Sequence, residues 1–299
     1  MGERFRAVAH ELGVMLKEQR DAAGLSLVRL SAKVGHPVAT LHRMETGERT
    51  VTSEVEVVHY LAACGASHVE LKRLAEFCRE SGHQRGHWVV PSSQWISDSL
   101  RSLVFHESTA NRSVSYESEI IPGLLQTEPY MRTFFAHWDL SADEMDALVR
   151  ARIERQRVLF RNNPAKYTFF VHERALHLEI GDFRIMAEQM LAMMFFADQW
   201  NIEVRIVPSA ARQRGLFGGS FKYHGYKRFK PLVYMDAPMG GVFFEDERYV
   251  ERVRALVPKI ADVALEARES RDFVAKLADK YDRSEGGWDD AWRVAQHQL

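Results

Sequence analysis

The sequence predicts a multidomain protein, with an all-α domain of five helices followed by an α+β domain whose sheet is mainly antiparallel. Short amphipathic segments, separated by serine caps and glycine stops, fill residues 1–80. Short runs of alternating or apolar residues, mixed with longer helical segments and broken by Gly and Pro, fill residues 106–280. A chain of 299 residues is long enough for two cores of ordinary size.

The first helix is predicted over residues 7–23, where Val8, Leu12 and Leu16 recur at helical spacing before Gly24. Residues 25–49 then predict two short helices joined by a tight turn. Four residues punctuate this segment as caps, turns or stops, namely Ser26, Gly35, Pro37 and Gly47. Two short helices joined by a glycine turn are typical of a helix-turn-helix motif, so residues 1–80 are predicted to form a helix-turn-helix domain.

The second helix of this motif, predicted from Val38 to Thr46, has two distinct sides. Leu41 and Met44 are three residues apart and would face the core. Val38, Ala39, His42 and Arg43 would face outward, where a recognition helix meets base edges in the major groove. The spacing therefore favours binding to double-stranded DNA.

The charge of residues 1–80 is balanced, with 11 Lys and Arg against 11 Asp and Glu. Cations in or beside the motif are nevertheless placed to meet phosphates, and they are Arg20, Arg29, Lys33, Arg43 and Arg49. A neutral domain gains little non-specific affinity from counterion release. We therefore expect two copies to bind together, as a homodimer on a DNA site with two halves.

Two further helices complete the first domain. Ser53 is predicted to cap a helix over residues 54–63, with Val55, Val58 and Leu61 facing inward, and a fifth helix follows to about Arg79. Residues 81–105 interrupt every clear period and predict a linker. The α+β domain is then expected over 106–280, with a tail over 281–299 in which Trp288 and Trp292 are four residues apart, as if to share a helix face.

In the second domain, strands are predicted over residues 115–121, 167–172 and 202–207, and as a meander over 221–226, 232–236 and 242–244. Ser141, with Glu144 three residues later, predicts a capped long helix. Residues 221–230 interleave aromatic and basic side chains. This pattern fits either a single-stranded nucleic-acid surface or, more simply, a strand pair with a solvated basic edge.

Several other classes of function find no support in the residues. No apolar run is long enough to span a bilayer, the first residues lack the apolar stretch of a secretory signal, and the two cysteines form no CxxC pair. The histidines of His172-Glu-Arg-Ala-Leu-His177 are five apart rather than the four of a zinc-binding helix. No nucleophile and base stand at a usable spacing. We expect a cytoplasmic protein that is not an enzyme and uses neither metal nor cofactor.

Residues 12–63 resemble the lambda-repressor-type, xenobiotic-response-element class of regulators. The matching positions end in RMETGER, which is similar to that family's RIExGxR, and they include Leu30, Gly35, Thr40, Arg43, Glu45 and Gly47. The resemblance implies that the helix beginning near Val38 enters the major groove, and it carries Val38, Ala39, Thr40, His42 and Arg43 over as DNA contacts. Leu27 and Val28 depart from the family, which often has polar residues there near the phosphates.

The second domain resembles the C-terminal domain of actinobacterial helix-turn-helix regulators. The phrases that carry the resemblance are IIPGLLQTEPY at 120–130, RARIERQ at 150–156, VRIVP at 204–208, GGSF at 218–221 and VYMD at 233–236. These antitoxin-like regulators are often encoded beside a small partner protein, and no catalytic residues follow from the resemblance. Read from its residues alone, PGLLQT is either a structural turn with a Thr127 helix cap or a contact for a ligand or partner.

Together these observations predict a sequence-specific transcriptional regulator. Its first domain would bind DNA, with Val38, Ala39, Thr40, His42 and Arg43 at the bases and Arg29, Lys33 and Arg49 beside them. Its second domain would dimerise and receive a signal from a small protein or a ligand. The alternative is an antitoxin-like interaction protein that neutralises a small partner through its C-terminal domain.

Overall fold

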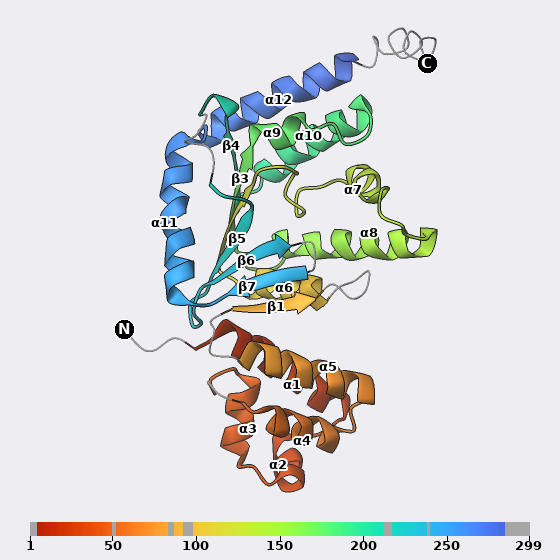
Figure 1. The fold of residues 1–299 in the computed structure, drawn as a ribbon, viewed down its shortest axis with the longest axis vertical. Helices are drawn as coiled ribbons and strands as arrows, with labels where there is room; N and C mark the ends of the chain where they lie inside the picture. Colours follow the sequence, from red (N-terminus) through yellow and green to blue (C-terminus); the bar gives the residue numbers. More distant parts are fainter. Residues whose placement is uncertain are drawn as a thin grey trace. The chain divides into compact units, whose positions relative to one another are not determined.

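A computed structural model describes residues 5–49, 52–82, 87–91, 98–211, 217–237 and 240–284. Figure 1 shows the elements, coloured along the chain. In order, these are α1 (Ala7–Ala22), α2 (Leu27–Val34), α3 (Val38–Glu45), α4 (Glu54–Cys64), α5 (His68–Gly82), β1 (His87–Pro91), α6 (Asp98–Thr109), β2 (Arg112–Glu117), α7 (Glu128–Phe135), α8 (Ala142–Gln156), the 3-10 helix η1 (Arg157–Leu159), β3 (Lys166–His172), α9 (Glu173–His177), α10 (Phe183–Ala197), β4 (Ile202–Val207), β5 (Phe221–Gly225), β6 (Leu232–Ala237), β7 (Gly240–Phe244), α11 (Glu247–Val263) and α12 (Ala267–Ser284).

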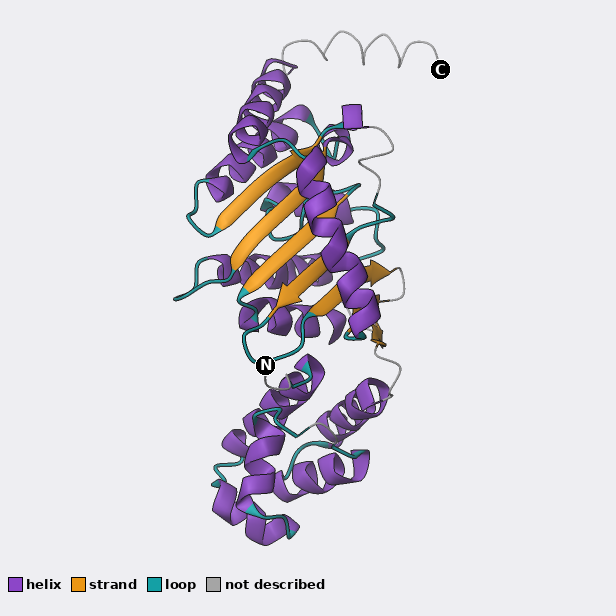
Figure 2. Ribbon diagram, turned by 90° about the vertical axis from the view of Figure 1, so that its left-hand side faces the viewer, coloured by secondary structure: helices purple, strands orange, loops and turns teal. Residues whose placement is uncertain are grey.

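The first five helices form close to their predicted bounds, and Figure 2 shows them as a helical region without strands. The side chain of Ser26 accepts a hydrogen bond from the Arg29 amide at the start of α2, and Gly35 ends that helix in the left-handed conformation with φ of 74°. Ser53 and Glu56 form a complete capping box on α4. The helices share a core that includes Leu12, Leu16, Leu30, Leu41, Met44, Val57, Tyr60, Leu61 and Leu74.

One predicted core position in α4 is wrong. Val55 is 65% exposed, whereas Val57, Tyr60 and Leu61 are buried. The buried residues keep the i, i+3, i+4 spacing of a helix face, so the apolar stripe exists but is rotated from the predicted one. Valines at neighbouring positions in this segment made the two registers indistinguishable by hydrophobicity alone.

The described strands form one seven-stranded sheet in the order β1-β7-β6-β5-β2-β3-β4. The chain divides into two compact units, the first comprising Met1–Arg112 with Tyr223–Arg254 and the second Ser113–Lys222 with Ala255–Leu299. In the first unit, β7 pairs antiparallel with both β1 and β6. Each unit therefore combines two segments that are far apart in the sequence. The sequence predicted domains that are consecutive stretches of the chain, so it did not anticipate this division.

The sheet is mostly antiparallel, as predicted, but it is a mixed sheet because it also contains a parallel pair. In the second unit β3 and β4 pair in parallel, Phe169 opposite Val204 and Val171 opposite Ile206. The physical reason is the connection between them, because α9 and α10 form a long crossover of the kind that parallel neighbours require. Both strands are buried almost without interruption, as expected for strands covered on two faces.

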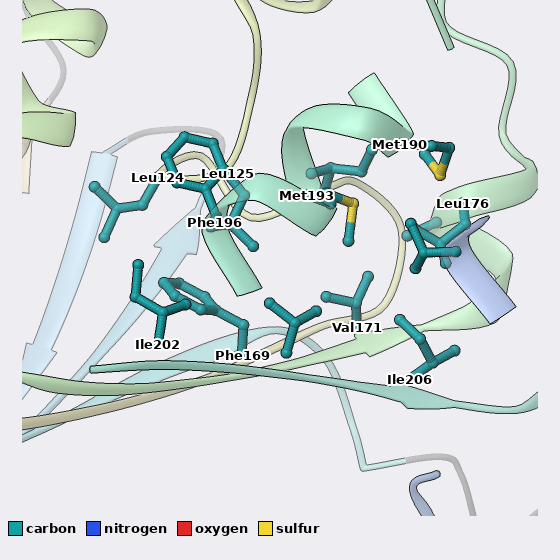
Figure 3. Packing of buried hydrophobic residues seen from close by; sticks show 14 of the residues in the cluster. Leu124, Leu125, Phe169, Val171, Leu176, Met190, Met193, Phe196, Ile202 and Ile206 are labelled. Carbon is teal, nitrogen blue, oxygen red and sulfur yellow. The ribbon is translucent and has the colours of Figure 1, made fainter. Parts of the chain in front are cut away.

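The main core of the second unit lies where α10 and α12 pack on these two strands. Figure 3 shows Phe169 and Val171 of β3 and Ile202 and Ile206 of β4 beneath Met193. Arg205 interrupts the apolar pattern of β4 but is also buried, because its guanidinium donates to the carbonyl oxygens of Leu265, Ala261 and Ala264. These carbonyl groups lie at and just after the C-terminal end of α11, where a cation also complements the helix dipole.

Residues 81–105 are not the predicted linker where the structure describes them. Residues 87–91 form β1, and α6 begins at Asp98. Trp88 is only 3% exposed and its ring is stacked on Phe243 of β7, with 5.2 Å between the centroids. The strand is stabilised by a partner more than a hundred residues away, so its own five residues carry little signal. Trp288 and Trp292 of the predicted tail lie outside the described residues.

The basic segment at residues 221–230 is solvated only in its second half, after β5. Strand β5 lies inside the sheet order, between β6 and β2. Lys222 is 8% exposed and its ammonium is 3.0 Å from the Glu117 carboxylate. A buried lysine with a carboxylate partner satisfies its charge within the protein, so Lys222 does not belong to a solvated edge. Lys227, Arg228 and Lys230, which follow β5, are exposed, so the expectation of a wet basic surface holds only for the end of the segment.

Candidate nucleic-acid interface

Helices α2 and α3 present an outer face that is rich in cations. Arg29 and Lys33 on α2, and His42 and Arg43 on α3, are exposed to solvent. Arg29 and Arg43 form no ion pair with an acidic side chain in the part of the chain that the structure describes. Helix α3 also exposes Ala39 and, to 39%, Val38.

The remaining predicted contacts differ in their surroundings. Thr40 is half-buried, and Arg49 is half-buried with its guanidinium 2.6 Å from the Glu56 carboxylate. The ammonium of Lys33 donates to the carbonyl oxygen of Ala63 at 3.1 Å, at the C-terminal end of α4. The structure thus brings all eight predicted residues to α2, α3 and the turn that follows, while direct contact of each with DNA stays a prediction.

The Glu56 carboxylate does not oppose this positive face. Burial alone would raise its pKa, but the backbone N–H of Ser53, Arg49 and the Ser53 hydroxyl together outweigh burial and lower the pKa below its usual range. The charged form is thus held by the α4 cap and by Arg49. One acidic group beside the recognition helix is therefore neutralised within the domain.

Arg20 is not available to phosphates, contrary to the sequence-based expectation. It is 8% exposed and forms a two-pronged ion pair with Glu45, with Nε–Oε1 at 2.6 Å and Nη2–Oε2 at 2.8 Å. The Tyr60 hydroxyl donates to the same carboxylate at 2.5 Å. The hydrogen bond to Glu45 raises the pKa of Arg20, and burial followed by Glu45 raises the pKa of Tyr60. The pair fixes the end of α3 to α1 and α4.

Two glycines set how closely α3 and its turn approach α1. A Cβ built on Gly13 of α1 would lie 2.4 Å from the carbonyl oxygen of Met44 in α3. Gly47, which follows α3 with φ of 70°, approaches α1 so closely that a Cβ there would lie 2.5 Å from Cα of His10. Both contacts are backbone to backbone, so neither has a flexible side chain that could yield. The outer face of α3 is thus held by a rigid inner contact.

Sequence reasoning singled out the outer face but missed the groups that hold it. Glu45 belongs to the RMETGER phrase, and its charge at a helix position next to Met44 was the available signal. A charged residue in line with core positions is expected to be paired when buried. The partner, Arg20, is too far away in sequence for spacing to reveal it.

The residues of the other motifs make packing, hydrogen-bonding and helix-capping contacts within the protein. In PGLLQT, Leu124 and Leu125 are buried, and Gln189 donates to the Leu125 carbonyl oxygen at 2.7 Å while accepting from the Thr127 amide. His172 caps the short helix α9 by accepting from the Arg174 amide.

No group of three or more His, Cys, Asp or Glu is arranged to hold a metal ion in the described residues. The described helices also include none long and apolar enough to cross a membrane.

Comparison with family models gives two matches. Residues 11–74 match a helix-turn-helix domain, which covers α2, α3 and the helices packed on them. Residues 100–276, more than half of the chain, match the domain of unknown function DUF5753. Comparisons with curated proteins and with solved structures gave no match. The protein therefore carries a helix-turn-helix domain at its N-terminal end, and the chain belongs to the DUF5753 family.

Proposed function

We propose that this protein is a cytoplasmic, sequence-specific DNA-binding regulator of transcription, and not an enzyme. The observation that carries the proposal is the outer face of α3 with α2. Four side chains that can donate to bases or phosphates, Arg29, Lys33, His42 and Arg43, are exposed there within a matched helix-turn-helix domain. In this geometry the second motif helix lies in the major groove and its exposed side chains contact base edges.

In this mode of recognition, α3 would contact bases, whereas α2 and the turn after α3 would contact phosphates. Arg43 and His42 on α3 would read bases, since arginine and histidine donate to acceptors in the major groove. Arg29 at the start of α2, Lys33 and Arg49 would contact phosphates and fix the register. Val38 and Ala39 would meet the apolar edge of a thymine, and Thr40 would lie at the margin of this surface.

We further propose that the protein acts as a homodimer. The balanced charge of residues 1–80 supports this, because one such domain has a weak phosphate contribution to its affinity. Two linked copies would each bind one half of a symmetric site and raise the total affinity. Sedimentation equilibrium of the full chain at micromolar concentration tests this point; a mass of twice 34.4 kDa is expected, and a monomer bound to one half-site would contradict it.

The C-terminal domain would receive the signal, from a small protein or from a ligand. Exposed aromatic side chains of the second unit support a protein partner, with Phe160, Phe195 and Trp200 being 51%, 60% and 75% exposed. Aromatic residues are enriched where proteins bind one another. The same observation favours the second candidate, an antitoxin-like protein that neutralises a small partner through this domain. The two functions are compatible within one chain.

A gel-shift titration with the DNA upstream of the protein's own gene tests the regulator proposal. The wild-type chain is expected to shift this DNA and not a scrambled duplex of the same composition. The double variant Arg43→Ala with His42→Ala is expected to lose the shift, since each base contact contributes about 1–3 kcal/mol.

Arg254→Ala serves as the matched control, because Arg254 is an exposed arginine of α11 that is paired with Glu251 and lies outside the helix-turn-helix match. It should bind DNA like the wild type. Equal binding by the double variant and the control would contradict the assignment of α3 as the recognition helix. Co-expression with any small protein that is encoded beside the gene then separates the two candidates. A complex that forms without any sequence-specific DNA binding would favour the antitoxin-like function.

A further inference from the structure

A row of buried polar side chains joins α1 to two segments outside the helix-turn-helix match. Nε2 of His106 in α6 is 3.1 Å from a carboxylate oxygen of Glu11 in α1. On the other side of the imidazole, Nδ1 of His106 is 2.9 Å from the Tyr226 hydroxyl, just after β5. Glu11 and His106 are fully buried and Tyr226 is 7% exposed. All three residues belong to the first compact unit.

The surroundings of Tyr226 keep its hydroxyl protonated, so that it can donate a hydrogen bond within this row. Burial, with the nearby carboxylates of Glu245, Glu11 and Glu107, raises the pKa of Tyr226 well above its usual value. The phenol therefore keeps its proton and can donate a hydrogen bond to Nδ1 in the tautomer that carries its N–H on Nε2, the nitrogen 3.1 Å from Glu11. A buried carboxylate without a partner is costly, so Glu11 makes the position of α1 depend on His106.

Further contacts connect the N-terminal end of α1 to the loop between β5 and β6 and to Glu245, which follows β7. The Glu245 carboxylate accepts from the Val8 amide and from Arg6 Nε, each at 3.0 Å, and so caps a helix that has no side-chain cap of its own. The His10 ring is stacked on Phe229, with centroids 4.1 Å apart. These groups are also within the first unit.

The opposite side of α1 holds the recognition helix. Gly13 touches the carbonyl end of α3, and Arg20 holds Glu45 in the two-pronged ion pair. One more contact links the turn after α3 directly to the same loop, because Arg228 pairs with Glu48. Helix α1 therefore contacts His106 on one side and α3 on the other.

We infer that His106 and Tyr226 are positioning residues for DNA recognition, acting on α3 through Glu11 and α1. They lie in the segment that matches DUF5753, at residues 100–276, whereas Glu11 and α3 lie in the helix-turn-helix match. The buried row is thus a physical connection through which one matched segment positions the other. This inference rests on the proposed DNA-binding function.

The test measures binding of the full chain to a duplex that the wild type selects from a random-sequence library, at a temperature where circular dichroism shows each variant folded. His106→Ala is expected to lower the affinity for this duplex about tenfold, and Arg43→Ala likewise. If His106 acts by placing Arg43, the double variant loses clearly less than the product of the two single losses, about thirtyfold instead of about a hundredfold. A purely structural role would give independent losses.

Conservative variants and a control sharpen the result. His106→Gln keeps an N–H donor and an acceptor on one side chain and should bind within about threefold of the wild type. Tyr226→Phe removes only the hydroxyl and should weaken binding in the same direction as His106→Ala, so it replaces that variant if the alanine change prevents folding. His59→Ala, at an exposed position of α4, should have no effect.

Hydrogen–deuterium exchange without DNA separates this inference from the proposed function. His106→Ala should speed exchange of backbone amides in residues 38–49, whereas His59→Ala should not. Faster exchange together with no sequence-specific binding by the wild type would leave the coupling intact and remove the DNA-binding function. Unchanged exchange, or fully independent affinity losses in His106→Ala and Arg43→Ala, would overturn the coupling.

Discussion

The guanidinium of Arg20 donates two hydrogen bonds to the carboxylate of Glu45, from Nε at 2.6 Å and from Nη2 at 2.8 Å, and both side chains are buried. It joins the last residue of α3 to α1, the helix whose His10 ring is stacked on Phe229 in the β5–β6 loop. Buried pairs of this kind are costly to break from one side, since the remaining charge is left without a partner. The exposed face of α3 therefore depends on an ion pair on its hidden face.

Removing one side of this pair should destabilise the first unit strongly. For Glu45→Ala we expect a loss of about 3–5 kcal/mol in the free energy of unfolding, because Arg20 stays buried without its carboxylate. Glu54→Ala, which breaks the pair with Arg79 at a half-exposed site, should cost about 0–1 kcal/mol. Urea denaturation followed by circular dichroism measures both. Equal losses in the two variants would contradict the role given to Glu45.

Gly47 and Gly65 offer a matched test of close packing. Both have φ near 70°, but a Cβ at Gly65 would meet no atom within 4 Å, whereas at Gly47 it would lie 2.5 Å from His10 Cα. Gly65→Ala should cost about 1–3 kcal/mol, from the backbone conformation alone. Gly47→Ala should cost more, since the turn must also move away from α1. Thermal melts of the two variants compare them, and a smaller shift for Gly47→Ala would refute the close contact.

The stability of the first unit should fall as the pH drops below 6.5, in part because of His10. Burial, then His106 and Arg228, lower the pKa of His10 to about 4, against an opposing effect of Glu11. Between pH 6.5 and about 4 the unfolded chain binds a proton that the folded chain does not, so acid favours unfolding. Above pH 6.5 the group is neutral in both states and adds no pH dependence.

His10→Phe isolates this effect, because phenylalanine keeps a ring over Phe229 and does not titrate. Between pH 7.5 and 5.0, the wild type should lose more of its melting temperature than His10→Phe does. His59→Phe, at the exposed position in α4, should behave like the wild type. Parallel pH profiles for the wild type and His10→Phe would show that His10 is protonated in the folded state as readily as in the unfolded chain.

Arg29 should contribute to DNA affinity through phosphates rather than bases. Its side chain is exposed at the start of α2, which in the proposed mode lies beside the backbone of the duplex. Arg29→Ala should weaken binding to all duplexes alike and reduce the slope of log K against log salt by about 0.9. Fluorescence anisotropy at several salt concentrations measures this slope. Weaker binding with an unchanged slope would exclude a phosphate contact.

Local signals in the sequence identified most helices and their ends. Ser26, Ser53, Thr127 and Ser141 all cap helices in the structure as their positions predict. The glycine turn at Gly35 and the start of α3 at Val38 follow from the same kind of evidence. Caps and turns depend on neighbours within a few residues, which is why one sequence suffices to find them.

Features that depend on distant partners were not predictable. Strand β1 forms because Trp88 packs against Phe243, and β3 pairs in parallel with β4 because a helical crossover separates them. For the candidate site, the outer residues of α3 followed from periodicity, whereas the pairing of Arg20 with Glu45 did not. Arg20 looked like a phosphate contact because a sequence gives its charge but not its burial.

The central claim is that the outer face of α3 reads a DNA sequence, and the specificity ratio tests it most directly. This ratio compares affinity for a duplex selected by the wild type with affinity for a scrambled duplex at the same salt concentration. We predict at least about 10³ for the wild type and a fall by a factor of ten or more for Arg43→Ala with His42→Ala. A wild-type ratio near one, or a ratio that the double substitution leaves unchanged, would contradict the account.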